Sequence, residues 1–129
     1  MDFKKMIVDL LRKKKLLRKT AFVFLYGSVS RGEATPLSDI DICISLNLPA
    51  KERLRARISL LADLPERYDI TIFEDLPIYV QREVFQGKLL YTSNQKIVMT
   101  TALETIRNYE DFKPYYDYYI AKDKSLVEI

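Results

Sequence analysis

Two aspartates at alternate positions follow a glycine–serine turn in the stretch GSVSRGEATPLSDIDI, residues 27–42. Asp39 and Asp41 lie in a segment that alternates polar and apolar residues, so a β-strand would place both carboxylates on one face, about 7 Å apart. Mg²⁺ accepts a few carboxylate oxygens together with substrate phosphates, and two such ions stabilise the attacking and leaving oxygens of phosphoryl transfer. The two aspartates therefore predict a site for divalent cations.

The glycine–serine turn ahead of the aspartates favours the binding of a phosphate chain. Gly27 and Ser28 directly follow the apolar run AFVFLY, and the free backbone N–H groups of such a turn attract anions. Arg31 is a candidate to pair with phosphate oxygens, and the alternative is that it is a solvated surface residue. The segment matches the first half of a P-loop, but Glu33 and Ala34 stand where lysine and serine or threonine are required, so the P-loop interpretation fails.

The composition excludes several other chemistries. The sequence contains no histidine, which removes serine–histidine and cysteine–histidine catalysis and histidine zinc sites. The single cysteine, Cys43, has no partner within the chain, so we expect a small buried side chain and a reducing, cytoplasmic location. The longest apolar run, residues 21–26, is too short to span a bilayer. The cationic run at 11–19 suits the solvated end of a helix, and we expect neither a membrane partner nor direct nucleic-acid binding.

Alternating helix and strand patterns surround these residues. Apolar residues at helical spacing predict helices over 3–18, 49–64, 76–87 and 95–121. Alternating or β-branched runs predict strands over 20–26, 38–46, 67–73 and 88–92. With 129 residues, of which 48% are hydrophobic, the chain suits one domain. The expected fold class is therefore α/β, with helices packed on a small sheet of about four strands.

Three details of the helices are also predicted. The buried face of the second helix is expected at Leu54, Ile58, Leu61 and Leu64. Gly87 is expected to cap the third helix, and Pro114 to interrupt the fourth.

The stretch 27–41 resembles the signature of the DNA polymerase β-like nucleotidyltransferases, G-S-x(3)-G-x(5)-S-D-x-D. The matching residues are Gly27, Ser28, Gly32, Ser38, Asp39 and Asp41. The length of the chain is similar to that of the minimal branch of this family. The resemblance implies an α+β fold in which helices pack against a mixed β-sheet. It also implies ATP or another nucleoside triphosphate as substrate, and two Mg²⁺ ions, with Mn²⁺ as an alternative.

The same resemblance implies a third carboxylate on a later strand, facing the first two. Asp69 in YDITIF is the preferred candidate, because it lies on a face of a predicted strand. Asp63, on a predicted helix, and Asp75, in a predicted loop, are the rivals. Asp39, Asp41 and Asp69 are thus the expected catalytic and metal-binding residues. Gly27, Ser28, Arg31 and Ser38 are the expected nucleotide-binding residues.

The C-terminal segment YEDFKPYYDYY, residues 109–119, is rich in aromatic residues. A helix would align Tyr109, Phe112, Tyr116 and Tyr119 in one stripe, which we interpret as covering the domain's own sheet. Tyr115 and Tyr118 widen the apolar arc beyond that stripe. Tyrosine is enriched at protein interfaces, so residues 95–129 are expected to form a helical tail for partner docking within the single domain 1–129.

This tail resembles those of minimal nucleotidyltransferases that act as antitoxins beside a HEPN-domain ribonuclease toxin. The resemblance implies transfer of AMP from ATP to a tyrosine of the toxin. The chain cannot itself be that toxin, because the HEPN ribonuclease motif requires histidine. Two alternatives stay open: an antitoxin or binding module that acts by contact alone with a vestigial site, and nucleotidyl transfer to a small molecule such as an aminoglycoside.

Overall fold

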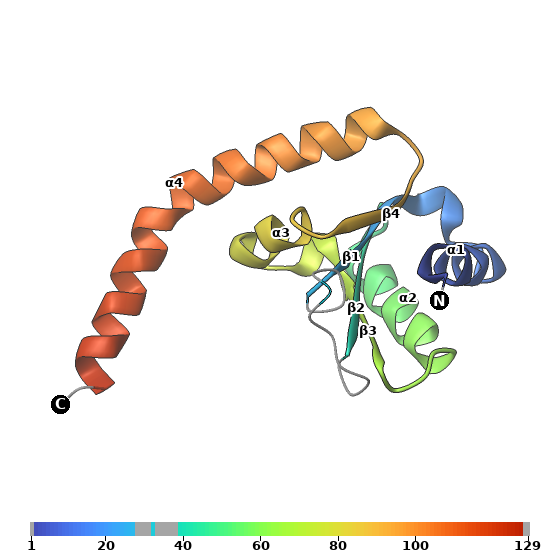
Figure 1. Cartoon of the computed structure of the whole chain (residues 1–129), viewed down its shortest axis with the longest axis horizontal. Coiled ribbons are helices and arrows are strands. Elements are labelled where there is room, and N and C mark those ends of the chain that lie inside the picture. Colours follow the sequence, from blue (N-terminus) through green and yellow to red (C-terminus); the bar gives the residue numbers. More distant parts are fainter. Residues whose placement is uncertain (1, 28–31, 33–38, 128–129) are drawn as a thin grey trace.

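A four-stranded mixed sheet lies at the centre of the molecule in the computed structural model (Figure 1), which describes residues 2–27, 32 and 39–127. The strands are β1 (Thr20–Tyr26), β2 (Ile40–Leu46), β3 (Tyr68–Ile72) and β4 (Lys88–Thr92). Their order across the sheet is β3-β2-β1-β4. β1 is antiparallel to β2 and β4, whereas β2 and β3 are parallel. The predicted fold class and all four predicted strands are confirmed.

Helices cover both faces of this sheet and bury two separate clusters of hydrophobic side chains. On one face, α1 (Phe3–Lys13) and α2 (Ala50–Ala62) pack on aliphatic side chains of all four strands. On the other face, residues of α3 (Ile78–Val84) and α4 (Gln95–Val127) pack on an aromatic cluster. Its rings lie 5.1–5.6 Å apart between centroids and belong to Phe22, Phe24, Phe73 and Phe85. Because all four strands contribute to a core, the edge of the sheet that carries the predicted site is held rigidly.

Cys43 lies within the aromatic cluster and is fully buried. Burial raises the pKa of its thiol above the ordinary value. The cysteine is therefore a small core residue, as the sequence predicts.

The first and third helices are shorter than predicted. α1 ends at Lys13, because Lys15 has a positive φ of 61° and the Leu16 N–H donates to the Leu11 carbonyl, which reverses the chain. α3 ends at Val84, and Gly87 is not its left-handed cap, since the described glycines with positive φ are Gly27 and Gly32. A Cβ at Gly87 would instead overlap the carbonyl oxygen of Leu25. This glycine is needed for close approach to β1, so the cap prediction is wrong.

The buried face of α2 also differs from the prediction. Ala56 and Leu60 face the core, whereas Leu54 and Ile58 are 55% and 59% exposed. The small Ala56 side chain lets the helix approach the sheet closely, which turns the predicted stripe partly toward solvent. Only the C-terminal part of that stripe, Leu61 and Leu64, packs against the core.

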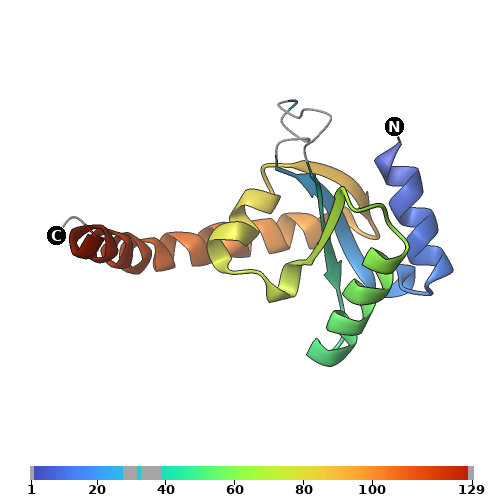
Figure 2. The ribbon, with the colours of Figure 1, turned by 90° about the horizontal axis from the view of Figure 1, so that it is seen from below.

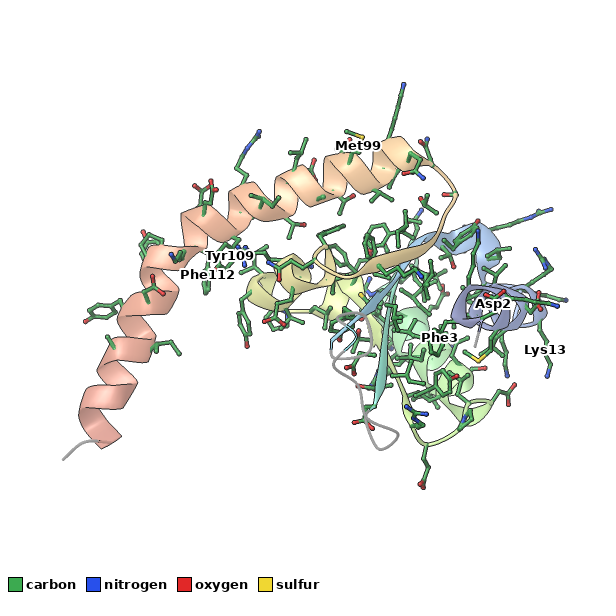
Figure 3. All side chains as sticks on the ribbon, in the orientation of Figure 1. Asp2, Phe3, Lys13, Met99, Tyr109 and Phe112 are labelled. Atoms are coloured by element: carbon green, nitrogen blue, oxygen red, sulfur yellow. The ribbon has the colours of Figure 1, made fainter. Side chains whose placement is uncertain are left out.

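α4 is a single helix of 33 residues that continues through Pro114 rather than being interrupted there. Its first half packs on α3 and β1, and its second half leaves the domain as an arm (Figures 1 and 2). The helix bends near Tyr109 and Phe112 (Figure 3), within about a turn of Pro114, whose ring removes a backbone hydrogen bond.

The two described side chains of the predicted aromatic stripe do not cover the sheet as expected. Tyr109 stacks under Arg82 of α3, with the guanidinium carbon 4.6 Å from the ring centroid, and Phe112 is 38% exposed. The side chains of Tyr116 and Tyr119 lie outside the described residues. Within the described part of the chain, no helix is long and apolar enough to cross a membrane.

Candidate active site

The predicted carboxylates gather at one edge of the sheet, where β1 ends and β2 and β3 begin. Tyr26 of β1 is the register partner of Asp41, and Asp41 is the register partner of Asp69 on β3. Residues in register on neighbouring strands point to the same face, so Asp41 and Asp69 lie side by side. Asp39, an exposed residue, immediately precedes β2. One pair of carboxylates on adjacent strands, with a third just ahead, forms an acidic edge.

The electrostatics of this edge are unfavourable without a cation. Burial raises the pKa of Asp41 above the ordinary aspartate value, and the negative charges of Asp69 and Asp39 raise it further. A divalent cation between these groups would remove the repulsion and stabilise the ionised carboxylates.

Gly27 brings the backbone at the end of β1 directly against Asp41. Its φ is +78°, a conformation that other residues rarely adopt, and a Cβ there would lie 2.5 Å from Asp41 Oδ2. Both observations require glycine at this position, which lets the backbone approach the Asp41 carboxylate closely. Ser28, Arg31 and Ser38 lie outside the described residues.

The carboxylates fit Mg²⁺ together with a nucleotide better than a closed metal site. In the parts of the chain that the structure describes, no three acidic or cysteine side chains converge closely enough to hold an ion by themselves. Mg²⁺ is usually bound by one or two carboxylates, with water and substrate phosphates completing its shell. Asp39, Asp41 and Asp69 match that open arrangement.

The two rival carboxylates lie elsewhere and are occupied by cations. Asp63 pairs with Lys14, with Nζ and Oδ2 2.8 Å apart. The positive charges of Lys14 and Lys13 lower the pKa of Asp63. Asp75 pairs with Arg53, whose Nη2 lies 2.8 Å from Oδ1. Neither residue is in register with Asp41, so Asp69 is the geometrically matched candidate.

Three side chains beside the carboxylates are not predicted from the sequence. The Tyr26 hydroxyl lies 3.2 Å from the Thr71 hydroxyl, a hydrogen bond that reaches across β2. Desolvation raises the Tyr26 pKa, and the nearby Asp41 and Asp69 add to the effect. Arg57 of α2 reaches Asp69, with Nη2 3.6 Å from Oδ1. The alternation of YDITIF places Thr71 on the same strand face as Asp69, although it predicts no role for it, and nothing in the predicted helix face indicated Arg57.

Comparison with known proteins identifies the class of this site. Residues 5–96 match the model of the polymerase beta, nucleotidyltransferase family. The match covers well over half of the chain, and the chain belongs to this family of nucleotidyltransferases. The expectation drawn from the glycine–serine and aspartate signature is thereby confirmed.

Individual relatives extend the comparison. A Methanocaldococcus jannaschii protein named as a protein adenylyltransferase is 33% identical over 97 residues, which cover 75% of this chain and 70% of the relative. A chain in a crystal structure of a toxin–antitoxin with AMP-PNP superposes with a TM-score of 0.77 at 23% identity, covering 95% of this chain and 98% of the other. A further match is a structure of the tri-AMPylated Shewanella oneidensis HEPN toxin in complex with an MNT antitoxin. Its TM-score is 0.71 at 22% identity, covering 94% and 95% of the two chains. At these identities the two structures show that the fold is shared with this protein.

Proposed function

We propose that this nucleotidyltransferase transfers AMP from ATP to a hydroxyl group of a HEPN-domain toxin, a tyrosine hydroxyl by preference, and acts as the antitoxin of the pair. The observation that carries the proposal is the alignment of Asp41 and Asp69 beside Gly27 in a chain of this family. The name of the M. jannaschii relative and the fold shared with antitoxins bound to HEPN toxins support a protein acceptor.

The proposed roles follow from the position of each group. Asp39 and Asp41 hold two Mg²⁺ ions, or Mn²⁺ in their place, and Asp69 completes the inner metal site. When bound, the metal neutralises charge on the phosphates. The backbone at Gly27 contacts the triphosphate, and Ser28, Arg31 and Ser38 are proposed as further nucleotide contacts.

The reaction balances without another reactant. The acceptor oxygen forms a bond to the α-phosphorus of ATP as the bond from that phosphorus to the bridging oxygen breaks, and pyrophosphate leaves. Asp69 assists removal of the proton from the acceptor hydroxyl, and the proton passes to solvent. Most of the rate enhancement comes from positioning and charge neutralisation, as in other phosphoryl transfers.

The arm of α4 supplies the docking surface in this proposal. Residues 95–129 dock the partner, and the exposed Tyr115 and Tyr118, at 67% and 63%, lie on the part of the helix that leaves the domain. A cytoplasmic location agrees with the single unpaired cysteine.

Intact-mass spectrometry tests the function. The full chain is incubated with its separately purified HEPN-domain partner, ATP and Mg²⁺. We expect the partner to gain mass in steps of one AMP unit. A partner that binds and gains no mass would contradict the proposal and favour inhibition by contact alone.

A further inference from the structure

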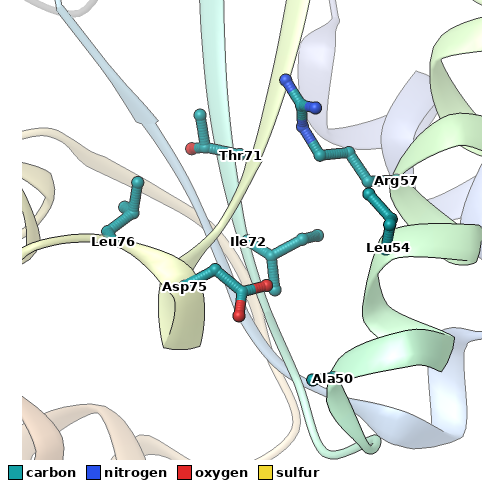
Figure 4. Close-up of a pocket in the computed structure, with 7 residues that line it drawn as sticks. All are labelled: Ala50, Leu54, Arg57, Thr71, Ile72, Asp75 and Leu76. Carbon is teal, nitrogen blue, oxygen red and sulfur yellow. The ribbon is translucent and has the colours of Figure 1, made fainter.

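A hollow of about 390 Å³ opens at the outer edge of β3, next to the carboxylates. β3 is an edge strand, so this side of the sheet is not covered by a neighbouring strand. In Figure 4, Leu54 and Arg57 of α2 stand on one side of the hollow, Asp75 and Leu76 on the other, and Thr71 and Ile72 of β3 between them. None of these residues is among the predicted metal or nucleotide contacts.

The hollow begins where the acidic edge ends. Arg57 lines the hollow and reaches Asp69, with Nη2 3.6 Å from Oδ1. Its Nε donates a hydrogen bond of 2.7 Å to the Ile70 carbonyl oxygen, which fixes the guanidinium at the boundary. Thr71, another lining residue, lies two positions after Asp69 and therefore on the same face of β3. Arg57 and Thr71 thus link the hollow to Asp69 at the acidic edge.

The order of groups across the sheet gives the hollow a direction relative to the reaction. Gly27 lies at the end of β1, Asp41 on β2, Asp69 on β3, and the hollow beyond Asp69. In an in-line displacement the acceptor oxygen and the leaving pyrophosphate lie on opposite sides of the α-phosphorus. If the triphosphate binds at Gly27, as proposed, this order leaves the Asp69 side for the acceptor.

We propose that this hollow binds the segment of the acceptor protein that carries the reactive hydroxyl. The inference rests on the proposed function and adds to it the place where the acceptor enters. Protein substrates need such a subsite, since a docking arm alone does not hold one hydroxyl in line with the phosphorus.

The lining indicates the chemistry of that segment. Leu54, Ile72 and Leu76 offer an apolar wall. Asp75 is paired with Arg53 at 2.8 Å, whereas Arg57 lies at the longer distance of 3.6 Å from Asp69 and places a positive charge at the end of the hollow nearest the carboxylates. The hollow therefore suits an apolar side chain next to the hydroxyl-bearing residue and an acidic residue facing Arg57.

Two matched substitutions test the proposal. Leu54→Glu changes a residue that lines the hollow, and Ile58→Glu changes one a single turn later on α2 that does not; their exposures are 55% and 59%. The assay measures AMP transfer by the full chain to the purified HEPN-domain partner at concentrations below KM, with thermal shift by Mg²⁺–ATP in parallel. We expect Leu54→Glu to lower kcat/KM for the partner about tenfold through lost apolar contact and added charge. Its Mg²⁺–ATP shift should be unchanged, and Ile58→Glu should match the parent in both assays.

The other outcomes separate the competing explanations. Loss of the Mg²⁺–ATP shift in folded Leu54→Glu would show that the hollow holds the nucleotide base and would overturn the proposal. Equal rates for both variants and the parent would also overturn it, while leaving the proposed function intact. If the parent itself transfers no AMP, the proposed function fails and this inference fails with it. Leu54→Ser, which adds no charge, repeats the test if Leu54→Glu melts below the parent.

Discussion

The raised pKa of the Asp41 carboxylate means that this side chain, when ionised, lowers the stability of the folded protein. Burial, Asp69 and Asp39 make its ionised form less favourable in the folded protein than in the unfolded chain. The cost is absent below the unfolded pKa, appears as the pH rises from there through the raised folded pKa, and is fully present above it. In a metal chelator, the stability of the parent relative to Asp41→Asn should therefore fall across this acidic window as the pH rises.

Asp41→Asn is expected to remove this cost and the activity together. In chelator at neutral pH the variant should melt no lower than the parent, with a smaller advantage at acidic pH. It should lose AMP transfer by about a hundredfold or more. It should also lose the stabilisation by Mg²⁺–ATP, which is about 2.7 kcal/mol for a ligand at about one hundred times its Kd. Thermal melts with and without Mg²⁺–ATP measure the stability changes. Asp39→Asn and Asp69→Asn should likewise lose AMP transfer and the stabilisation by Mg²⁺–ATP.

Asp63→Asn and Asp75→Asn are the matched controls. Each removes an aspartate that pairs with a cation away from the acidic edge, so each should keep the Mg²⁺–ATP shift. Unfolding of Asp41→Asn in chelator would show that the carboxylate is structural. A full ligand-induced shift in Asp41→Asn would contradict its assignment to the metal site.

At the scale of the elements, the strands were predictable and the buried face of α2 was not. Period-two alternation in SDIDICISL and the buried run TAFVFLY report the local pleat of the chain, and both segments form the expected strands. The buried face of α2 depends instead on which side chain lets the helix approach the sheet. Ala56 decides this, and no periodicity in the helix reveals it. The exposed Leu54 that results is the residue on which the proposed acceptor subsite depends.

The arm of α4 provides a prediction at the same scale. Removing residues 114–129 should leave the domain folded, because Thr105 remains buried and Tyr109 remains stacked under Arg82. Partner binding should weaken by at least about tenfold, since exposed tyrosines often dominate interfaces. Calorimetric titration of the partner measures this. The control is Leu103→Ser in the full chain, which changes an exposed residue, at 61%, on the half of α4 that lies against the domain. Unchanged affinity after truncation would show that the arm is not the docking surface.

At the scale of the whole molecule, the sequence predicted the family and the acidic edge through one short stretch. This prediction was possible because Gly27, Asp39 and Asp41 are close together in the chain, and their spacing alone places both carboxylates beside the glycine turn. Asp69 could be chosen over Asp63 and Asp75 only through a predicted strand, and its register with Asp41 supports the choice. The contacts of Arg57 and Tyr26, and the hollow beside β3, are formed by segments far apart in the sequence. No local sequence pattern predicts contacts of this kind.

The most direct test of the central claim follows each end of the ATP molecule separately. The full chain and its HEPN-domain partner are incubated with Mg²⁺ and ATP labelled in the α-phosphate or in the γ-phosphate. We expect the α-label to appear on the partner, the γ-label to appear in pyrophosphate, and Asp41→Asn to abolish both. Transfer of the γ-label to the partner would identify a kinase, and no transfer of either label to a bound partner would identify an inhibitor that acts by contact. Either result would contradict the account of Asp39, Asp41 and Asp69 as the site of AMP transfer.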